Sequence, residues 1–180
     1  MKRVATRVRP WFAPIALIAA LALTATAASA APAPQVGITS FAELATPLPY
    51  PYDETADADA AVASAKARAR AAHKLLLIEL GGNWCGDCRI LAATMDRPEV
   101  KAFVDAHFVL VTVDVGRFDR NLQIPAHYGI TQRLEGVPAL LVVEPRRDRL
   151  LDGGHVSALE DARNMTPQAL ADWLAQWTRN

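Results

Sequence analysis

The chain has 180 residues, 52% of them hydrophobic and 21% charged, which is enough for one ordinary domain with some sequence left over. This composition excludes a disordered or collagen-like chain, and two cysteines are too few for a disulfide-stapled mini-protein. Residues 1–30 hold four basic residues and no acid, which leaves 15 basic and 19 acidic residues, a net charge of −4, in residues 31–180. A mildly acidic body lacks the cations that bind phosphate backbones, so we expect no nucleic-acid partner.

Residues 1–30 have the three parts of a secretory signal peptide. A basic stretch precedes an apolar run (residues 11–23), and small residues then end in an Ala-Ser-Ala triplet at Ala30. We predict cleavage after Ala30, a periplasmic or secreted protein without a membrane attachment, and a compartment in which disulfides persist. The alternative is an uncleaved anchor, because residues 11–31 approach the ~20 residues that span a bilayer.

The rest of the chain divides into a proline-rich lead-in (residues 31–56) and a domain (residues 57–180). Prolines favour an extended lead-in that lies against the domain surface. Residues 57–73 contain no Gly or Pro and predict a helix, whereas the apolar runs at 74–80 and 108–115 predict buried strands.

The remaining elements follow from their boundary residues and apolar spacing. Helices are predicted from Cys85 to Met95, from Pro98 onward, over 121–129 and after the N-cap Thr166, and residues 139–143 and 149–151 predict an antiparallel pair of strands. Strands that alternate with helices, then a hairpin and a closing helix, predict an α/β fold with a central mixed β-sheet flanked by helices.

The two cysteines form a Cys-x-x-Cys pair, Cys85 and Cys88, at the start of a predicted helix and directly after a predicted strand. The first sulfur then faces unpaired backbone N–H groups and the positive end of the helix dipole, which both favour its thiolate. This arrangement indicates a redox-active dithiol.

Two other interpretations of the pair stay open. It could be half of a zinc site, but no second pair exists and the four histidines lack ligand-like spacing. It could be a purely structural disulfide, but so short a loop would stabilise the fold little. We therefore expect no metal and no cofactor other than the Cys85–Cys88 disulfide itself.

The segment from Ile78 to Cys88 (IELGGNWCGDC) resembles the active-site strand and loop of the thioredoxin superfamily, and Gly136-Val137-Pro138 resembles that family's approach to its cis-proline. The resemblance covers roughly residues 57–180 and implies a thioredoxin-like fold. It further implies an exported, monomeric thiol–disulfide oxidoreductase that reduces or exchanges disulfides in protein substrates and is served by a redox partner protein. The alternatives are a non-catalytic thioredoxin-fold binding module and, with less support, a metal-handling protein.

The resemblance also implies roles for single residues. Cys85 would be the attacking thiolate and Cys88 the resolving thiol. Glu79, six residues before Cys85, would be a buried acid that exchanges a proton with Cys88, although it could instead be a solvated strand residue. Trp84 would cover the sulfur pair or pack in the core. Val137, with the adjacent Pro138, would form the groove that pairs with substrate backbone.

Three features depart from the family pattern. The second strand has no lysine, residues 131–135 lengthen the loop beside the expected groove, and Gly86-Asp87 replaces Gly-Pro between the cysteines. We expect the negative charge of Asp87 to oppose the Cys85 thiolate, which favours a reductant over a strong oxidant.

Overall fold

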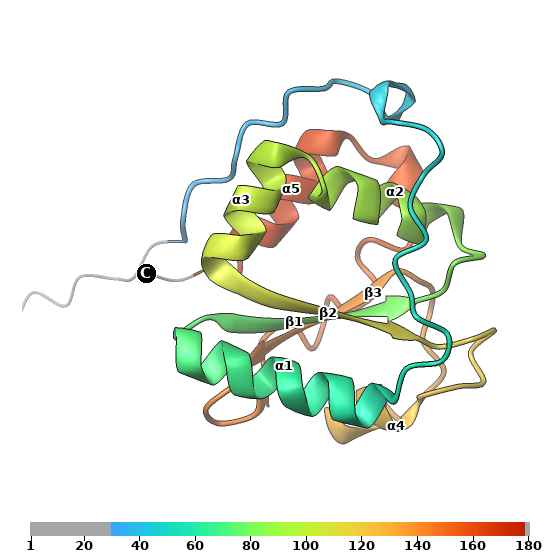
Figure 1. Cartoon of the computed structure of the whole chain (residues 1–180), viewed down its shortest axis with the longest axis vertical. Coiled ribbons are helices and arrows are strands. Elements are labelled where there is room, and N and C mark those ends of the chain that lie inside the picture. The colour runs from blue at the N-terminus through green and yellow to red at the C-terminus, as the bar shows by residue number, and fades with distance from the viewer. Residues whose placement is uncertain (1–29, 179–180) are drawn as a thin grey trace, which may run out of the picture.

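The computed structural model describes residues 30–178, which form one mixed sheet with helices on both of its faces (Figure 1). Its strands are β1 (Leu75–Gly81), β2 (Phe108–Asp114), β3 (Ala139–Glu144) and β4 (Arg149–Leu150). Its helices are α1 (Ala58–Ala72), α2 (Gly86–Met95), α3 (Pro98–His107), α4 (Gln123–His127) and α5 (Pro167–Ala175), with short 3-10 turns η1 (Phe41–Glu43) and η2 (Ala162–Asn164). The predicted α/β architecture is confirmed, and each predicted element has its counterpart.

The sheet has the strand order β2-β1-β3-β4, with β1 parallel to β2 and antiparallel to β3. Helices α1 and α4 lie on one face, and α2, α3 and α5 lie on the other (Figure 1). Side chains of β1 alternate between these faces, so Ile78 and Leu80 pack in the core under α1 whereas Leu77 packs with α2, α3 and α5. The apolar run of β1 is therefore explained by burial on both faces.

The loop after β1 positions the start of α2. Cys85 adopts an extended backbone conformation and is the N-cap of α2, directly before Gly86. Because α2 follows β1 after a short loop, and β1 is an inner strand between β2 and β3, the helix starts near the carboxyl end of β1. The topology thus places the cysteines at a fixed edge of the core.

The lead-in wraps around the domain (Figure 1). It runs across α3 and α2 and then descends toward α1 (Figure 1). Side chains of the domain hold its backbone at several points, among them Arg89 of α2, which donates from Nε to the Pro49 carbonyl (3.0 Å) and from its terminal nitrogen to the Leu48 carbonyl (2.6 Å). We call residues 48–52 the strap.

The predicted signal peptide lies outside the described residues, except for Ala30. Among residues 30–178, none of the helices has both the length and the apolar character that crossing a membrane requires.

Candidate functional site

Cys85 and Cys88 are joined in a disulfide at the start of α2, with their Cα atoms 5.3 Å apart. The Cys88 backbone N–H donates to Cys85 Sγ at 3.1 Å, so the first sulfur occupies the position of a capping acceptor. Cys85 is 5% exposed and Cys88 is fully buried. The helix start therefore supplies the backbone donor that would stabilise a thiolate on Cys85, while Cys88 is shielded beneath it.

A loop before β3 reaches the disulfide from the other side. The Val137 carbonyl oxygen lies 3.3 Å from Cys85 Sγ, and the Val137–Pro138 peptide bond is cis. Both residues are buried. The structure thus brings Val137, with the adjacent Pro138, to the first sulfur, although Val137 is 52 positions away in the sequence.

A cavity of about 530 Å³ opens beside the disulfide. Its lining includes Trp84, Phe118 and Glu135, together with Cys85 and Val137. The Trp84 side chain is 41% exposed, and its indole N–H donates to the Gly116 carbonyl at 2.7 Å. Trp84 is therefore a wall of the cavity and not a core residue, and the lengthened loop contributes Glu135 to the same cavity.

Glu79 is fully buried in β1, on the face that also carries Leu77. Its Oε1 accepts a hydrogen bond of 2.7 Å from the hydroxyl of Tyr52, whereas its Oε2 is buried without a hydrogen-bond partner among the described residues. Burial raises the pKa of Glu79 to about 7, and the Tyr52 hydrogen bond opposes that rise. The solvated alternative is wrong, and Glu79 can take up or release a proton near neutral pH.

Asp87 does not present a free negative charge to the cysteines. It is 8% exposed and accepts hydrogen bonds from the backbone N–H and the guanidinium of Arg163, at 2.5 to 3.1 Å. Burial opposes the ionisation of Asp87, but the bonds from Arg163 outweigh it and hold its pKa below the usual value. The expectation that the charge of Asp87 acts on Cys85 uncompensated is wrong, because Arg163 pairs with it. Nothing local in the sequence indicates this pair, since Arg163 lies 76 positions away.

The comparisons with known proteins agree with this geometry. A thioredoxin-like family model matches residues 57–145. A solved structure described as a disulphide isomerase from Xylella fastidiosa Temecula1 is 38% identical, covering 71% of this chain and 96% of that chain with a TM-score of 0.63. The chain belongs to the thioredoxin-like family.

Two solved structures match this thioredoxin-like chain less well. One is a DsbH oxidoreductase (20% identity, 57% of this chain and 81% of that chain, TM-score 0.37). The other is a protein of unknown function from Pseudomonas aeruginosa (22% identity, 65% and 81%, TM-score 0.37). Comparison with curated proteins finds no match.

Tyr52 is the site residue that sequence reasoning missed in this thioredoxin-like protein. It belongs to the lead-in, outside the segment that resembles the family, and it is 3% exposed. The strand position paired with Glu79 is Thr112, whose hydroxyl donates to the Pro51 carbonyl of the strap at 2.9 Å. The sequence shows only a tyrosine between Pro51 and Asp53, which does not say what the tyrosine contacts.

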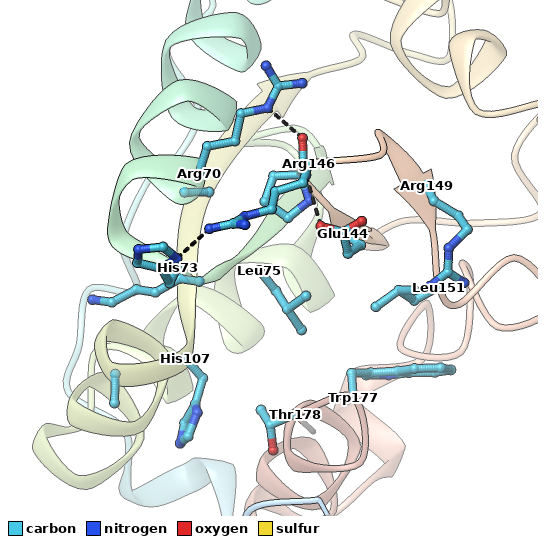
Figure 2. Close-up of a pocket in the computed structure, with 14 residues that line it drawn as sticks. Arg70, His73, Leu75, His107, Glu144, Arg146, Arg149, Leu151, Trp177 and Thr178 are labelled. Carbon is cyan, nitrogen blue, oxygen red and sulfur yellow. Dashed lines mark hydrogen bonds between the residues drawn. The ribbon is translucent and has the colours of Figure 1, made fainter. Parts of the chain in front are cut away.

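A second cavity, of about 520 Å³, lies at the opposite end of β1 from the disulfide (Figure 2). Its lining holds four cationic side chains, Arg70, Lys74, Arg146 and Arg149, and one acid, Glu144. Arg146 donates to His73 Nδ1 at 2.7 Å, and Arg70 Nε donates to the Pro145 carbonyl at 2.6 Å. His107 and Trp177 also line it. No group of three or more His, Cys, Asp or Glu side chains is placed to hold a metal ion within residues 30–178.

Proposed function

We propose that this protein is an exported thiol–disulfide oxidoreductase that reduces or exchanges disulfides in other proteins through Cys85 and Cys88. The observation that carries the proposal is the asymmetry of the pair. Cys85 caps the start of α2 and lines an open cavity, whereas Cys88 is fully buried on the same side of β1 as the Glu79 carboxyl. This asymmetry supports Cys85 as the sulfur that meets the substrate and Cys88 as the sulfur that resolves the intermediate.

The reaction needs two exchanges at sulfur. In the reduced protein, the Cys85 thiolate attacks one sulfur of a substrate disulfide, forming a mixed disulfide and releasing the first substrate thiolate. Cys88 then loses its proton and attacks Cys85 Sγ, which releases the second substrate thiolate and forms the Cys85–Cys88 disulfide. The substrate gains two electrons, and a redox partner protein would restore them to the cysteine pair.

Glu79 would act as the base for the second exchange. With a pKa of about 7, its carboxylate is present in quantity at neutral pH and can accept the proton that Cys88 loses. When the reaction runs in reverse, the protonated form would return that proton to Cys88.

Substrate would bind along the cavity beside Cys85. Trp84 supplies an exposed aromatic wall, and the cis-proline loop at Val137 and Pro138 lies against the attacking sulfur. An extended segment of the substrate chain would pair with the backbone of this loop, which would align its disulfide with Cys85.

Export to the periplasm is supported by the signal-peptide pattern of residues 1–30. Disulfides persist in that compartment, so an enzyme that reduces or exchanges them has substrates there. The solved structure at 38% identity is described as a disulphide isomerase, which supports the exchange reaction.

Trapping of mixed disulfides tests the proposal. Cys88→Ser leaves Cys85 able to attack but removes the resolving thiol, so disulfide-linked complexes with partner proteins should accumulate, while Cys85→Ser should yield none. The wild type should also reduce the disulfides of insulin in the presence of a thiol donor. If the wild type does not reduce insulin and Cys88→Ser traps nothing, the protein is a binding module and not an oxidoreductase.

A further inference from the structure

The hydroxyl group of Tyr52 contacts the Glu79 carboxyl and lies on the same side of Gly81 as the Cys88 sulfur. It donates to Glu79 Oε1 at 2.7 Å. A Cβ atom at Gly81 would lie 2.8 Å from Cys88 Sγ and would overlap the Tyr52 hydroxyl oxygen. The hydroxyl and the sulfur therefore flank the same α-carbon, and the hydroxyl fits there because Gly81 has no side chain.

Tyr52 is held in this place by the domain and not by its own neighbours in the lead-in. Its backbone N–H donates to Asn83 Oδ1 (3.1 Å), and its carbonyl accepts from Asn83 Nδ2 (2.8 Å). Thr112 fixes the preceding residue, Pro51, through the carbonyl of that proline. Because the backbone N–H and carbonyl of Tyr52 are both hydrogen-bonded, its side chain is already held in position before a proton is transferred, and little conformational entropy is lost in the transfer.

We propose that Tyr52 relays to Glu79 the proton that Cys88 loses when it resolves the mixed disulfide. The inference rests on the proposed function, in which Cys88 must become a thiolate. The Tyr52 oxygen takes the proton from Cys88 Sγ while its own hydroxyl proton passes to Glu79 Oε1. The step leaves a Cys88 thiolate, a protonated Glu79 and an unchanged Tyr52, so protons and charge balance.

The electrostatics of the site keep Tyr52 neutral throughout. Burial, and then the adjacent Glu79, raise the pKa of the Tyr52 hydroxyl far above its ordinary value, so a free tyrosinate does not form. Two other acids act on this pair, Asp96 at the C-cap of α2 and Asp114 of β2, and both disfavour further negative charge. A concerted transfer through the hydroxyl avoids that charge.

The two exchanges can be followed separately with an aromatic disulfide that releases a coloured thiolate, 5,5′-dithiobis(2-nitrobenzoate). Reduced protein should release one thiolate when Cys85 attacks and a second when Cys88 resolves, and stopped-flow absorbance gives both rates. Tyr52→Phe should leave the first rate within twofold of wild type. It should lower the plateau of the second rate about tenfold and move its pH midpoint upward, because Glu79 loses its hydrogen-bond donor.

Tyr50→Phe is the matched control, since Tyr50 lies in the same strap but is 67% exposed. It should leave both rates unchanged, and Glu79→Gln should slow the second rate at least as much as Tyr52→Phe. Failure of the proposed function would appear as a wild type that releases only one thiolate. Two normal phases in Tyr52→Phe, or a moved midpoint with an unchanged plateau, would overturn the relay and leave the function intact.

A proton inventory on the wild type decides the question if Tyr52→Phe does not fold. The second rate is measured in mixtures of light and heavy water. A relay moves two protons in one step and should give a curved dependence on the deuterium fraction, whereas direct transfer from Cys88 to Glu79 would give a straight line and exclude the relay.

Discussion

The ionised form of Glu79 lowers the free energy of unfolding, because the residue is fully buried and its Oε2 has no hydrogen-bond partner among the described residues. The size of this effect therefore depends on pH. The pKa of Glu79 rises from 4.5 to about 7 on folding. Between these values the folded chain holds a proton that the unfolded chain has released, so the free energy of unfolding falls as pH rises through this window and stays low above it.

Glu79→Gln should remove this dependence. Relative to wild type, the free energy of unfolding of the variant should increase by up to about 3 kcal/mol between pH 4 and pH 8, because one pKa unit is worth about 1.4 kcal/mol. Urea denaturation at both pH values, with the disulfide intact, measures it. The raised pKa of Asp152 contributes equally to both proteins and cancels in the difference. If the free energies of unfolding of the wild type and Glu79→Gln depend on pH in the same way, the pKa of Glu79 is not raised in the folded protein.

Arg163 should set the thiolate pKa of Cys85 by compensating Asp87. In Arg163→Gln the Asp87 carboxylate keeps its charge near the start of α2, so the Cys85 pKa should rise by up to about one unit, and Asp87→Asn in that background should reverse the rise. Ultraviolet absorbance of the thiolate against pH measures both variants. Arg146→Gln changes the same charge at the far cavity and should have no effect. A Cys85 pKa unchanged in Arg163→Gln would mean that Asp87 is too well shielded to act.

At the scale of the elements, the strap is held to the domain by hydrogen bonds from side chains, where a strand would be held by backbone pairing. The Asn83 amide makes two hydrogen bonds to the Tyr52 backbone, and Arg89 holds the carbonyls of Leu48 and Pro49. Asn83→Ala should destabilise the fold by about 1–3 kcal/mol, speed amide exchange in residues 48–52, and slow the resolving exchange without slowing the first.

Gln123→Ala is the control for Asn83→Ala, since it removes an exposed amide that donates to Asp59 and makes no bond to the strap. It should leave the strap protected from exchange and both reaction rates unchanged. Unchanged exchange of residues 48–52 in Asn83→Ala would show that Arg89 and Thr112 suffice to hold the strap.

The elements that could be predicted are those with a local pattern. Neighbouring residues in the sequence form each of these patterns: the apolar runs of β1 and β2, the Thr166–Pro167 start of α5, and the cysteine pair at the start of α2. The path of the strap and the Asp87–Arg163 pair could not be predicted, because each depends on hydrogen bonds between residues 31 to 76 positions apart. Such contacts leave no periodicity in the sequence.

At the scale of the whole molecule, the lead-in joins two distant places. It begins at Ala31, beside the end of α5 (Figure 1). Further along, its Tyr52 hydroxyl contacts the buried Glu79 side chain of β1. The second cavity, which contains Arg70 and Arg146, and the disulfide lie at opposite ends of β1. The lead-in therefore packs on the domain both at Ala31 and at Tyr52.

The beginning of the lead-in suggests where the mature chain starts. Ala31 is buried, and its backbone nitrogen donates to Thr178 Oγ1 (2.9 Å) and to the Thr178 carbonyl (3.1 Å). Cleavage after Ala30 would turn this nitrogen into an ammonium group beside the carboxyl end of α5, where the helix dipole favours positive charge. The new terminus would keep both acceptors and gain this attraction.

We expect protein recovered from the periplasm of an expression host to have the mass of residues 31–180. In that protein Thr178→Val should lower the free energy of unfolding by about 1 kcal/mol, because a buried acceptor of the Ala31 nitrogen is lost. Thr39→Val, which removes an exposed hydroxyl that donates to Glu43, should change it far less. Recovery of the uncleaved chain from the membrane fraction would instead support the anchor and contradict cleavage after Ala30.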